Sequence, residues 1–302
     1  MGSEGTDAMK ESETPNSQPQ IKSILVVGGR GMLGSDLVAL LQRDPAVSVA
    51  SADMGEIDIT RAVSVSHCLE QIRPDAVINC AAFTNVDACE AQEPAAFAVN
   101  GLGPELLAKA CASRGIRLVH ISTDYVFDGT KTTPYLPDDH PNPISAYGRT
   151  KLAGELAVAA FCRDHLIVRT AWLYGANGKN FVHTMLRLAK EKPELRVVSD
   201  QFGSPTFTGD LAALLARLVC CTATGITHAT NSGKCSWHEF ACEIVRQAGL
   251  STPVRPIASS EYPTPTKRPA WSVLDCSRTE QLAGVKIRHW RDALAEFLKK
   301  KE

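Results

Sequence analysis

The sequence lacks the features that mark membrane, fibrous and nucleic-acid-binding proteins. Its 302 residues contain no apolar run close to the roughly 20 residues that a membrane-spanning helix needs. Lysine and arginine total 32 against 33 aspartates and glutamates, so no excess of positive charge predicts binding to nucleic acid or to an anionic membrane. Aromatic residues make up only 6%, but a hydrophobic fraction of 44% supports a folded core and argues against disorder along the whole chain.

The ten cysteines form none of the common metal-binding or redox patterns. The sequence has no Cys-x-x-Cys pair and no His-Glu-x-x-His motif. The cysteines are scattered among apolar residues, and only Cys220 and Cys221 are adjacent. Free thiols in a reducing compartment are therefore favoured over a disulfide framework or a zinc site.

Residues 1–20 differ in composition from the rest of the chain. They contain no apolar block and are rich in Ser, Glu, Thr and Pro. A secretory signal needs an apolar central region, so this segment cannot serve as one. We predict a disordered leader outside the fold and, because no export signal is present, a cytoplasmic protein.

From residue 21 onward, short apolar runs alternate with segments of helical periodicity. Strands are predicted at 23–27, 47–50, 76–81, 117–122 and 166–170, with helices at 62–72, 95–113 and from 145. This alternation is typical of strand–helix–strand units with right-handed crossovers. The predicted fold class is therefore α/β, a Rossmann-type doubly wound parallel sheet over residues 21–175.

The second half of the chain is less regular. Helices are predicted at 181–191 and 236–248, short strands near 197 and 227, and a proline-rich loop at 251–269. We expect residues 176–302 to form mainly a smaller C-terminal substrate-binding lobe, with some elements returning to the core.

A glycine-rich turn follows the first predicted strand. Gly28, Gly31 and Gly34 are spaced G-x-x-G-x-x-G between a strand and a helix. Glycine lets the backbone approach a pyrophosphate, which then lies at the amide-rich start of the helix. Asp53, 19 residues after Gly34, is spaced to reach a ribose hydroxyl. Nucleotide binding is thus favoured over a plain turn, whereas Asp58 taken alone is more typical of a helix N-cap.

A tyrosine and a lysine lie four residues apart on the helix that Ser145 is predicted to cap. Tyr147 and Lys151 therefore share one face of that helix. A nearby ammonium lowers the pKa of a phenol from about 10, which suits proton transfer. The preceding strand ends at Thr123 and Asp124, and ligands of open parallel sheets bind at such carboxyl ends. A hydroxyl there can hold a carbonyl oxygen while the tyrosine protonates it; a simple strand-end cap is the alternative for Thr123.

Together these motifs resemble the extended short-chain dehydrogenase/reductases and, more narrowly, the dTDP-4-dehydrorhamnose reductase family. The resemblance runs from about residue 24 to about residue 298. The segments that carry it are GGRGMLG (28–34), INCAAFTNVDACE (78–90), STDYVFDG (122–129), AYGRTKLAGE (146–155), VRTAWLYG (168–175), NFVHTMLRLA (180–189), VSDQFGSPT (198–206) and RPAWSVLD (268–275). The last two, with the tryptophan of VRTAWLYG, are the most specific to this group.

The resemblance implies a set of cofactor-binding residues. They are Gly28, Gly31, Met32, Leu33, Gly34, Asp53, Asp58, Ile59, Ala82, Phe83, Thr84, Tyr147 and Lys151. Asp58 and Ile59 would hold the adenine, and residues 82–84 would follow the cofactor toward its nicotinamide. Asp53 would repel a 2′-phosphate, whereas Arg30 could accept one; we expect NADPH, with NADH also used. Some relatives are magnesium-dependent dimers, so Mg²⁺ and a homodimer are options, but no metal ligands can be assigned here.

The implied reaction is reduction of the C4 keto group of dTDP-4-dehydro-β-L-rhamnose to dTDP-L-rhamnose. Tyr147 would donate the proton, Lys151 would bind the nicotinamide ribose, and Thr123 would orient the oxygen. The residues that would contact the sugar are Thr123, Asp124, Tyr147 and Trp172.

Four further residues have weaker expectations. Asn100 matches a family asparagine that braces the active site through its helix. The basic candidates for the substrate pyrophosphate are Lys179, Arg187 and Arg268, each with a solvated surface charge as the alternative.

Two other functions stay open at this point. The regulatory β subunits of methionine adenosyltransferase resemble the same family, bind NAD(P) and act by binding another enzyme. Nucleotide-sugar epimerases and dehydratases share the fold; a dehydratase usually has Glu after the catalytic Asp, whereas Tyr125 follows Asp124 here. The intact tyrosine, lysine and sugar-site motifs favour catalysis of reduction.

Overall fold

The main sheet of the protein is parallel throughout. The computed structural model describes residues 21–299, so the leader predicted at 1–20 lies outside the described part. Six strands pair in the order β10-β5-β4-β3-β1-β2. Their bounds are β1 (Ser23–Val27), β2 (Ser48–Ala52), β3 (Ala76–Asn79), β4 (Arg117–Thr123), β5 (His165–Thr170) and β10 (Gly225–His228). The chain order reverses between β1 and β3, the switch point of a doubly wound sheet. The predicted fold class is confirmed.

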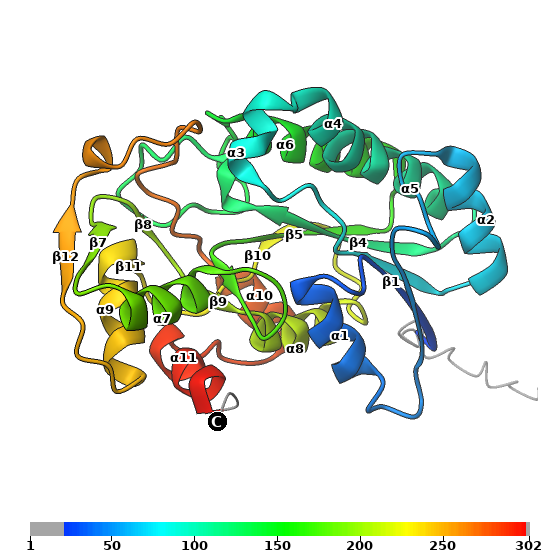
Figure 1. The fold of residues 1–302 in the computed structure, drawn as a ribbon. Coiled ribbons are helices and arrows are strands. Elements are labelled where there is room, and N and C mark those ends of the chain that lie inside the picture. The colour runs from blue at the N-terminus through cyan, green and yellow to red at the C-terminus, as the bar shows by residue number, and fades with distance from the viewer. Residues whose placement is uncertain (1–20, 300–302) are drawn as a thin grey trace, which may run out of the picture.

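Helices cover both faces of this sheet (Figure 1). One face is covered by α2 (Ala62–Ile72), α5 (Gly103–Ala112) and α6 (Ala146–Phe161), the other by α1 (Met32–Leu41), α8 (Thr208–Leu218) and α10 (Ser277–Ala283). Strand β1 shows how the sequence sorts these layers. Leu25 and Val27 pack against the first set of helices, and Ile24 and Val26 against the second. An uninterrupted apolar strand thus fills two cores with alternate side chains.

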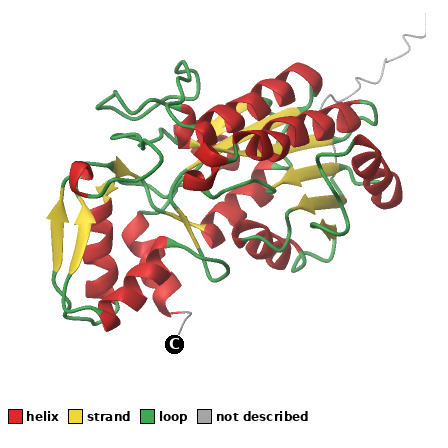
Figure 2. Ribbon diagram, turned by 45° about the horizontal axis from the view of Figure 1, so that its top comes forward, coloured by secondary structure: helices red, strands yellow, loops and turns green. Residues whose placement is uncertain are grey.

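The remaining elements form a smaller lobe at one end of the sheet (Figure 2). Its helices are α7 (Phe181–Glu191), α9 (Trp237–Gln247) and α11 (Trp290–Lys299), and its short strands are β6 (Leu173–Tyr174), β7 (Leu195–Val198), β8 (Phe202–Gly203), β9 (Thr206–Phe207), β11 (Cys235–Ser236) and β12 (Val254–Ile257). The strands pair as β7–β12, β8–β11 and β6–β9. Tyr174, Phe240 and Trp290 are at the centre of its core and are fully buried.

One detail of the second half differs from the sequence prediction. The strand near Thr227 is β10, which pairs with β5 and is one of the elements that return to the core. The segment 251–269 is not only a loop, because it contains β12 and a 3-10 turn at Ser259–Glu261. The prolines of this segment argued against a strand in the sequence. Pro256 is nevertheless tolerated in β12, because β12 is an edge strand and no partner strand accepts a hydrogen bond at that position.

The helix predicted at 95–113 is broken into parts. Helices α3 (Val86–Ala91) and α4 (Glu93–Phe97) are followed by a π-helical turn at Ala98–Leu102 and then by α5. Pro104 has no N–H to donate to the carbonyl of Asn100, four residues earlier, so the regular ladder is interrupted there. The N–H of Gly103 bonds instead to the carbonyl of Ala98, five residues back. Such π turns are frequent at functional sites.

Other sequence predictions concern the cysteines and the membrane. All ten cysteines are free thiols, as predicted. None of the helices within residues 21–299 is long and apolar enough to cross a membrane.

The buried histidine of β10 makes stability depend on pH. His228 is fully buried, lies opposite Arg169 in the sheet and contacts Phe127 edge-on. Burial and then the Arg169 charge lower its pKa to about 3, from an ordinary value near 6.5. Between pH 6.5 and pH 3, His228 is therefore protonated in the unfolded chain but stays neutral in the folded chain. This contribution to stability is present above pH 6.5 and is lost as the pH falls toward 3.

We expect the free energy of unfolding to fall less steeply below pH 6.5 in His228→Leu than in the wild type. Urea unfolding at a series of pH values measures this slope. The exposed His140→Gln serves as the control and should keep the wild-type slope. Equal slopes in wild type and His228→Leu would contradict the assignment.

Candidate active site

A cavity of about 530 Å³ opens at the switch point of the sheet, at the carboxyl ends of β1, β3 and β4. The predicted site residues on its walls are Gly28, Gly31, Met32, Leu33, Gly34, Asp53, Ala82, Thr84, Thr123, Asp124, Tyr147, Lys151 and Trp172. Three predicted residues do not line it: Asp58, Ile59 and Phe83. Most of the residues singled out from the sequence therefore line one cavity, although they lie in segments far apart in the chain.

The glycine turn builds an open cradle of backbone at the start of α1. Gly28 has φ +78°, a conformation that favours glycine. A Cβ at Gly34 would overlap the carbonyl oxygen of Gly28, so helix and turn can approach only because residue 34 is glycine. Gly31 is the N-cap of α1 and gives no side-chain cap to the first-turn amides. These N–H groups remain available to a pyrophosphate, and the cradle therefore fits a dinucleotide.

Charged side chains gather where the adenosine ribose of such a cofactor would lie. The backbone N–H of Arg30 donates to Asp53 Oδ2 at 2.7 Å, and the N–H of Asp53 donates to Glu56 Oε2 at 2.7 Å. The Arg30 guanidinium forms an ion pair with Glu56. The Asp53 N–H and then Arg30 hold the pKa of Glu56 below its usual value. Sequence reasoning missed Glu56 because only the fold brings it back onto the glycine turn.

Asp58 and Ile59 lie outside the cavity. Asp58 Oδ1 accepts hydrogen bonds from the N–H and the hydroxyl of Thr60, at 3.0 and 2.6 Å, a local turn like the cap considered from the sequence. Ile59 is 7% exposed and packs against Gly103 of α5.

Tyr147 and Thr123 meet at the centre of the cavity wall. Gly148 allows the first turn of α6 to press on the carbonyl of Tyr125, where any Cβ would overlap it. This approach places Tyr147 beside Thr123 on the same cavity wall, close enough for the Thr123 hydroxyl to act on the pKa of the phenol. Thr123 Oγ1 also accepts from the N–H of Tyr125 at 3.2 Å and donates to Asp124 Oδ1 at 3.0 Å.

The pKa of Tyr147 departs from the sequence expectation. An ammonium was expected to lower it, but burial raises it, and the hydrogen bond with Thr123 only partly offsets this effect. The protein alone therefore keeps the phenol protonated at neutral pH. That is the form a proton donor needs.

Lys151 is held beneath the same wall. Its side chain is 2% exposed, and its Nζ donates to the carbonyl of Ile121 at 2.7 Å. Its Nζ also lies 3.4 Å from Nε2 of the buried His120. Burial lowers the pKa of Lys151 to about 8.

The π turn places Asn100 as a clamp behind the cavity. Its Oδ1 accepts from the N–H of Phe83 at 2.8 Å, and its Nδ2 donates to the Phe83 carbonyl at 3.1 Å and to Thr150 Oγ1 at 3.2 Å. These bonds tie the segment after β3 to α6, the helix of Tyr147. Asn100 thus braces these two segments against each other. The backbone of Phe83 takes part in this contact, and Phe83 does not line the cavity.

The opposite wall of the cavity is aromatic. Trp172 has φ +50°, which is rare for a non-glycine residue, and its ring stacks on Trp237 with centroids 3.5 Å apart. Gly203 also packs against this ring, since a Cβ there would lie 2.5 Å from the indole. Burial raises the pKa of the neighbouring wall residue Asp124 to about 6, although hydrogen bonds with Ser272 and Thr123 oppose the shift. Trp237 had no signal in the sequence, because its stacking depends on two separate segments meeting.

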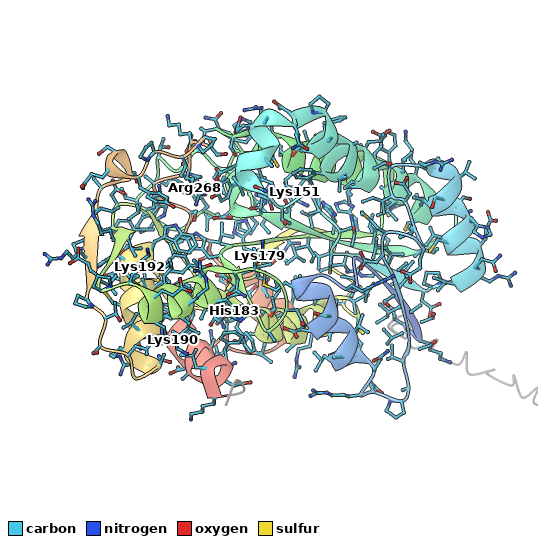
Figure 3. The ribbon with its side chains drawn as sticks, in the orientation of Figure 1. Lys151, Lys179, His183, Lys190, Lys192 and Arg268 are labelled. Carbon is cyan, nitrogen blue, oxygen red and sulfur yellow. The ribbon has the colours of Figure 1, made fainter. Side chains whose placement is uncertain are left out.

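The three basic candidates have different surroundings, and Figure 3 labels two of them, Lys179 and Arg268. Lys179 lies on the cavity wall, in the loop before α7. Arg268 lies 3.4 Å from Asp87 and acts electrostatically on Tyr125 of the wall. Arg187 is not part of the cavity, because it pairs with Glu191 one turn along an exposed face of α7.

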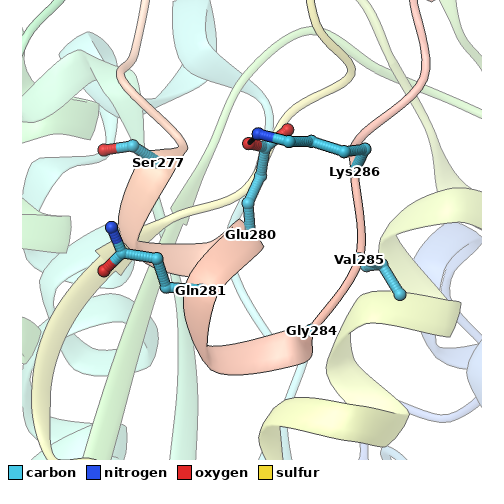
Figure 4. A pocket seen from close by; sticks show the side chains of 6 residues that line it. All are labelled: Ser277, Glu280, Gln281, Gly284, Val285 and Lys286. Atoms are coloured by element: carbon cyan, nitrogen blue, oxygen red, sulfur yellow. Dashed lines mark hydrogen bonds and ion pairs between the residues drawn. The ribbon is translucent and has the colours of Figure 1, made fainter.

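A second hollow lies at the C-terminal end of α10, away from this chemistry (Figure 4). Its charged residues, Glu280 and Lys286, pair with each other. Within the described part of the chain, no group of three or more His, Cys, Asp or Glu side chains is placed to hold a metal ion.

The parallel sheet, the glycine cradle and the Tyr147–Lys151 pair define the protein as an extended short-chain dehydrogenase/reductase. The family described as RmlD substrate binding domain matches residues 22–302, and the chain belongs to this family.

Relatives support the assignment over nearly the whole chain. A dTDP-4-dehydrorhamnose reductase of Streptomyces griseus is 45% identical over 90% of this chain and 91% of its own. A dTDP-4-keto-6-deoxy-D-glucose reductase of Streptomyces niveus is 44% identical over 90% of this chain and 95% of its own. The crystal structure of dTDP-4-dehydrorhamnose reductase from Bacillus anthracis in complex with NADP is similar with a TM-score of 0.89, at 36% identity over 93% of this chain and 100% of that one.

Proposed function

We propose that the protein reduces the C4 keto group of dTDP-4-dehydro-β-L-rhamnose to dTDP-L-rhamnose with NAD(P)H. The observation that carries the proposal is the contact between Tyr147 and Thr123 on the wall of a cavity that also contains the glycine cradle. A proton donor, a hydroxyl that orients oxygen and a dinucleotide cradle are the parts that a carbonyl reductase needs. The relatives at 44–45% identity are both named as reductases of a dTDP-4-keto sugar, and the Streptomyces griseus one is named for this reaction, which supports the proposal.

In this reaction each residue has a separate task. The reduced nicotinamide, when bound, supplies the hydride to C4. Thr123 holds the carbonyl oxygen by a hydrogen bond, and Tyr147 donates its phenolic proton to the alkoxide that develops there. Lys151 would bind the nicotinamide ribose, and the amides of residues 32–34 would hold the pyrophosphate.

The substrate lies between the core and the C-terminal lobe. Trp172 contacts the sugar from the aromatic wall, and Asp124 binds a sugar hydroxyl. Lys179, on the same cavity wall, binds the nucleotide pyrophosphate. The lobe thus acts as the substrate-binding part of the fold.

The purified chain should consume NADPH when given dTDP-4-dehydro-β-L-rhamnose, followed by loss of the reduced nicotinamide absorbance. The diastereomeric dTDP-4-keto-6-deoxy-D-glucose is the second candidate substrate, because the relative named for its reduction is about as similar as the one named for the rhamnose reaction. Turnover with only the second sugar would move the assignment to that reaction. No turnover with either sugar, by a folded chain that binds NADPH, would favour a regulatory subunit.

We propose NADPH as the preferred cofactor, with NADH accepted. The Arg30–Glu56 pair is exposed, with 64% and 54% of the side chains accessible, so it holds Arg30 only weakly. Arg30 can therefore turn to a 2′-phosphate, a stronger partner for its guanidinium. Asp53 remains at the ribose through its bond to the Arg30 N–H.

Two substitutions test this cofactor assignment. Arg30→Ala should lower the ratio of kcat/KM for NADPH over NADH by about ten- to a hundredfold, since a charged hydrogen bond contributes about 1.5–3 kcal/mol. Glu56→Gln should raise the ratio by only about two- to fivefold, because the exposed ion pair that competes for Arg30 is weak and screened by solvent. Arg61→Ala, at a nearby exposed arginine, is the control. A ratio that does not change in Arg30→Ala would refute the role of Arg30.

A further inference from the structure

A chain of three buried side chains runs behind the proposed active site, and the reaction as described uses only its last member, Lys151. Asn79 ends β3, His120 is in the middle of β4, and Lys151 is on α6. Asn79 is 1% exposed and His120 is fully buried. His120 Nδ1 lies 3.1 Å from Asn79 Nδ2, and His120 Nε2 lies 3.4 Å from Lys151 Nζ.

The backbone next to β3 fixes the direction of this chain. Asn79 Oδ1 accepts the N–H of Ala81 at 3.1 Å, so the amide NH₂ group of Asn79 faces His120. An NH₂ group can only donate, and Nδ1 of His120 must therefore accept. A neutral imidazole that accepts at Nδ1 carries its hydrogen on Nε2. That N–H is directed at Lys151.

An ammonium and an amine respond differently to this N–H. The ammonium of Lys151 has only donors, so it would face the Nε2–H of His120 donor to donor. The uncharged amine has a lone pair that can accept the Nε2–H while a remaining N–H donates to the Ile121 carbonyl at 2.7 Å. Every polar atom of the chain is satisfied only when Lys151 is uncharged.

We propose that His120 is a positioning residue that turns its Nε2–H toward Lys151 and so favours the amine over the ammonium at that side chain. The inference rests on the proposed function only for its consequence. Reduction leaves Tyr147 as a phenolate, which must regain a proton before the next turnover. The destabilised Lys151 ammonium gives up a proton readily, becoming an amine as the phenolate becomes a phenol, and a proton from solvent restores the ammonium before the next turnover.

The other groups around Lys151 do not account for this effect. Glu155 of α6 and then Cys80, which follows β3, act on Lys151 electrostatically, and both raise its pKa. Glu155 is committed to a buried pair with Arg169, at 2.9 and 2.7 Å. Burial lowers the pKa of Lys151 to about 8, and it lowers that of His120 well below its usual value, which keeps the imidazole neutral.

The test is direct titration of Lys151 in the full chain without ligand, by NMR of ¹⁵N-labelled lysine side chains. The Nζ shift separates ammonium from amine and requires no turnover, so the result is independent of the substrate assignment. We expect a midpoint well below that of an ordinary lysine, about 10.4. In His120→Asn the shorter amide can still accept from Asn79 but no longer reaches Lys151, and the midpoint should rise by at least about one pH unit.

A second variant, Asn79→Asp, tests the effect of His120 on the Lys151 midpoint by reversing the direction of the hydrogen bond at His120 Nδ1. In Asn79→Asp a carboxylate replaces the NH₂ group, so His120 Nδ1 becomes the donor and Nε2 presents a lone pair to the Lys151 ammonium. The midpoint should again rise. Cys111→Ala, at a buried cysteine of α5 that does not act on Lys151, is the control and should leave the midpoint within about 0.3 pH units.

A wild-type midpoint near that of an ordinary lysine would overturn the proposal. So would an unchanged midpoint in both His120→Asn and Asn79→Asp. If one variant does not fold, as judged by circular dichroism, the other decides. A confirmed midpoint shift in a chain that lacks reductase activity would leave the His120 assignment standing and refute only the proposed function.

Discussion

Replacing Tyr147 with phenylalanine should lower kcat by at least about a hundredfold, the usual contribution of a positioned general acid. The phenol is the group that contacts Thr123 on the cavity wall, and its raised pKa keeps it protonated at neutral pH. Phenylalanine keeps the ring and its edge-on contact with Tyr125, at 5.5 Å between centroids, but has no proton to donate. The affinity for NADPH should change little, because the substitution leaves the glycine cradle intact.

Steady-state kinetics and calorimetric titration of NADPH measure the two quantities separately. The matched control is Tyr262→Phe, which removes a hydroxyl from a side chain that is 60% exposed and far from the cavity wall. It should keep wild-type kcat. Near-normal turnover in Tyr147→Phe would eliminate Tyr147 as the proton donor.

Replacing Gly34 with alanine should raise the dissociation constant of NADPH by at least about a hundredfold. The new Cβ would overlap the carbonyl oxygen of Gly28 and would lie 2.8 Å from the Cα of Gly29. Both neighbours are backbone, so no side chain can turn away and α1 must shift relative to the turn. A hydrogen bond to a charged group contributes about 1.5–3 kcal/mol, and losing two of them from the cradle accounts for this factor.

Calorimetric titration at low temperature, with circular dichroism to confirm folding, measures this effect. Ser35→Ala is the control, since it changes the next residue of α1 without adding volume. An affinity of Gly34→Ala within threefold of the wild type would show that the cradle does not hold the cofactor pyrophosphate.

The parts of the fold that sequence could predict are those whose signals are local. The apolar run of β1, the helix α2 and the Ser145 N-cap of α6 lie where the periodicity placed them, and the Ser145 side chain accepts from Gly148 as a cap should. The π turn was missed because Pro104 was not weighed against the helical periodicity around it. That proline is the local signal that could have revealed the break.

In the candidate active site, too, the residues with local sequence signals could be predicted and the others could not. Motifs identified the glycine cradle, Tyr147, Lys151 and Thr123, since each is carried by a short segment at the end of a predicted strand. Glu56 and Trp237 act through contacts with residues distant in the sequence, so spacing gave no indication of them. The raised pKa of Tyr147 depends on burial, which a helix periodicity does not report.

The measurement that tests the central claim most directly is the fate of the transferred hydrogen. The chain would be incubated with dTDP-4-dehydro-β-L-rhamnose and NADPH deuterated at the nicotinamide C4, and the product examined by NMR. The account predicts dTDP-L-rhamnose with deuterium at C4 from one of the two NADPH epimers only, because the cradle and Tyr147 fix cofactor and sugar on one wall. A product without deuterium at C4, or no product from a chain that binds both ligands, would contradict it.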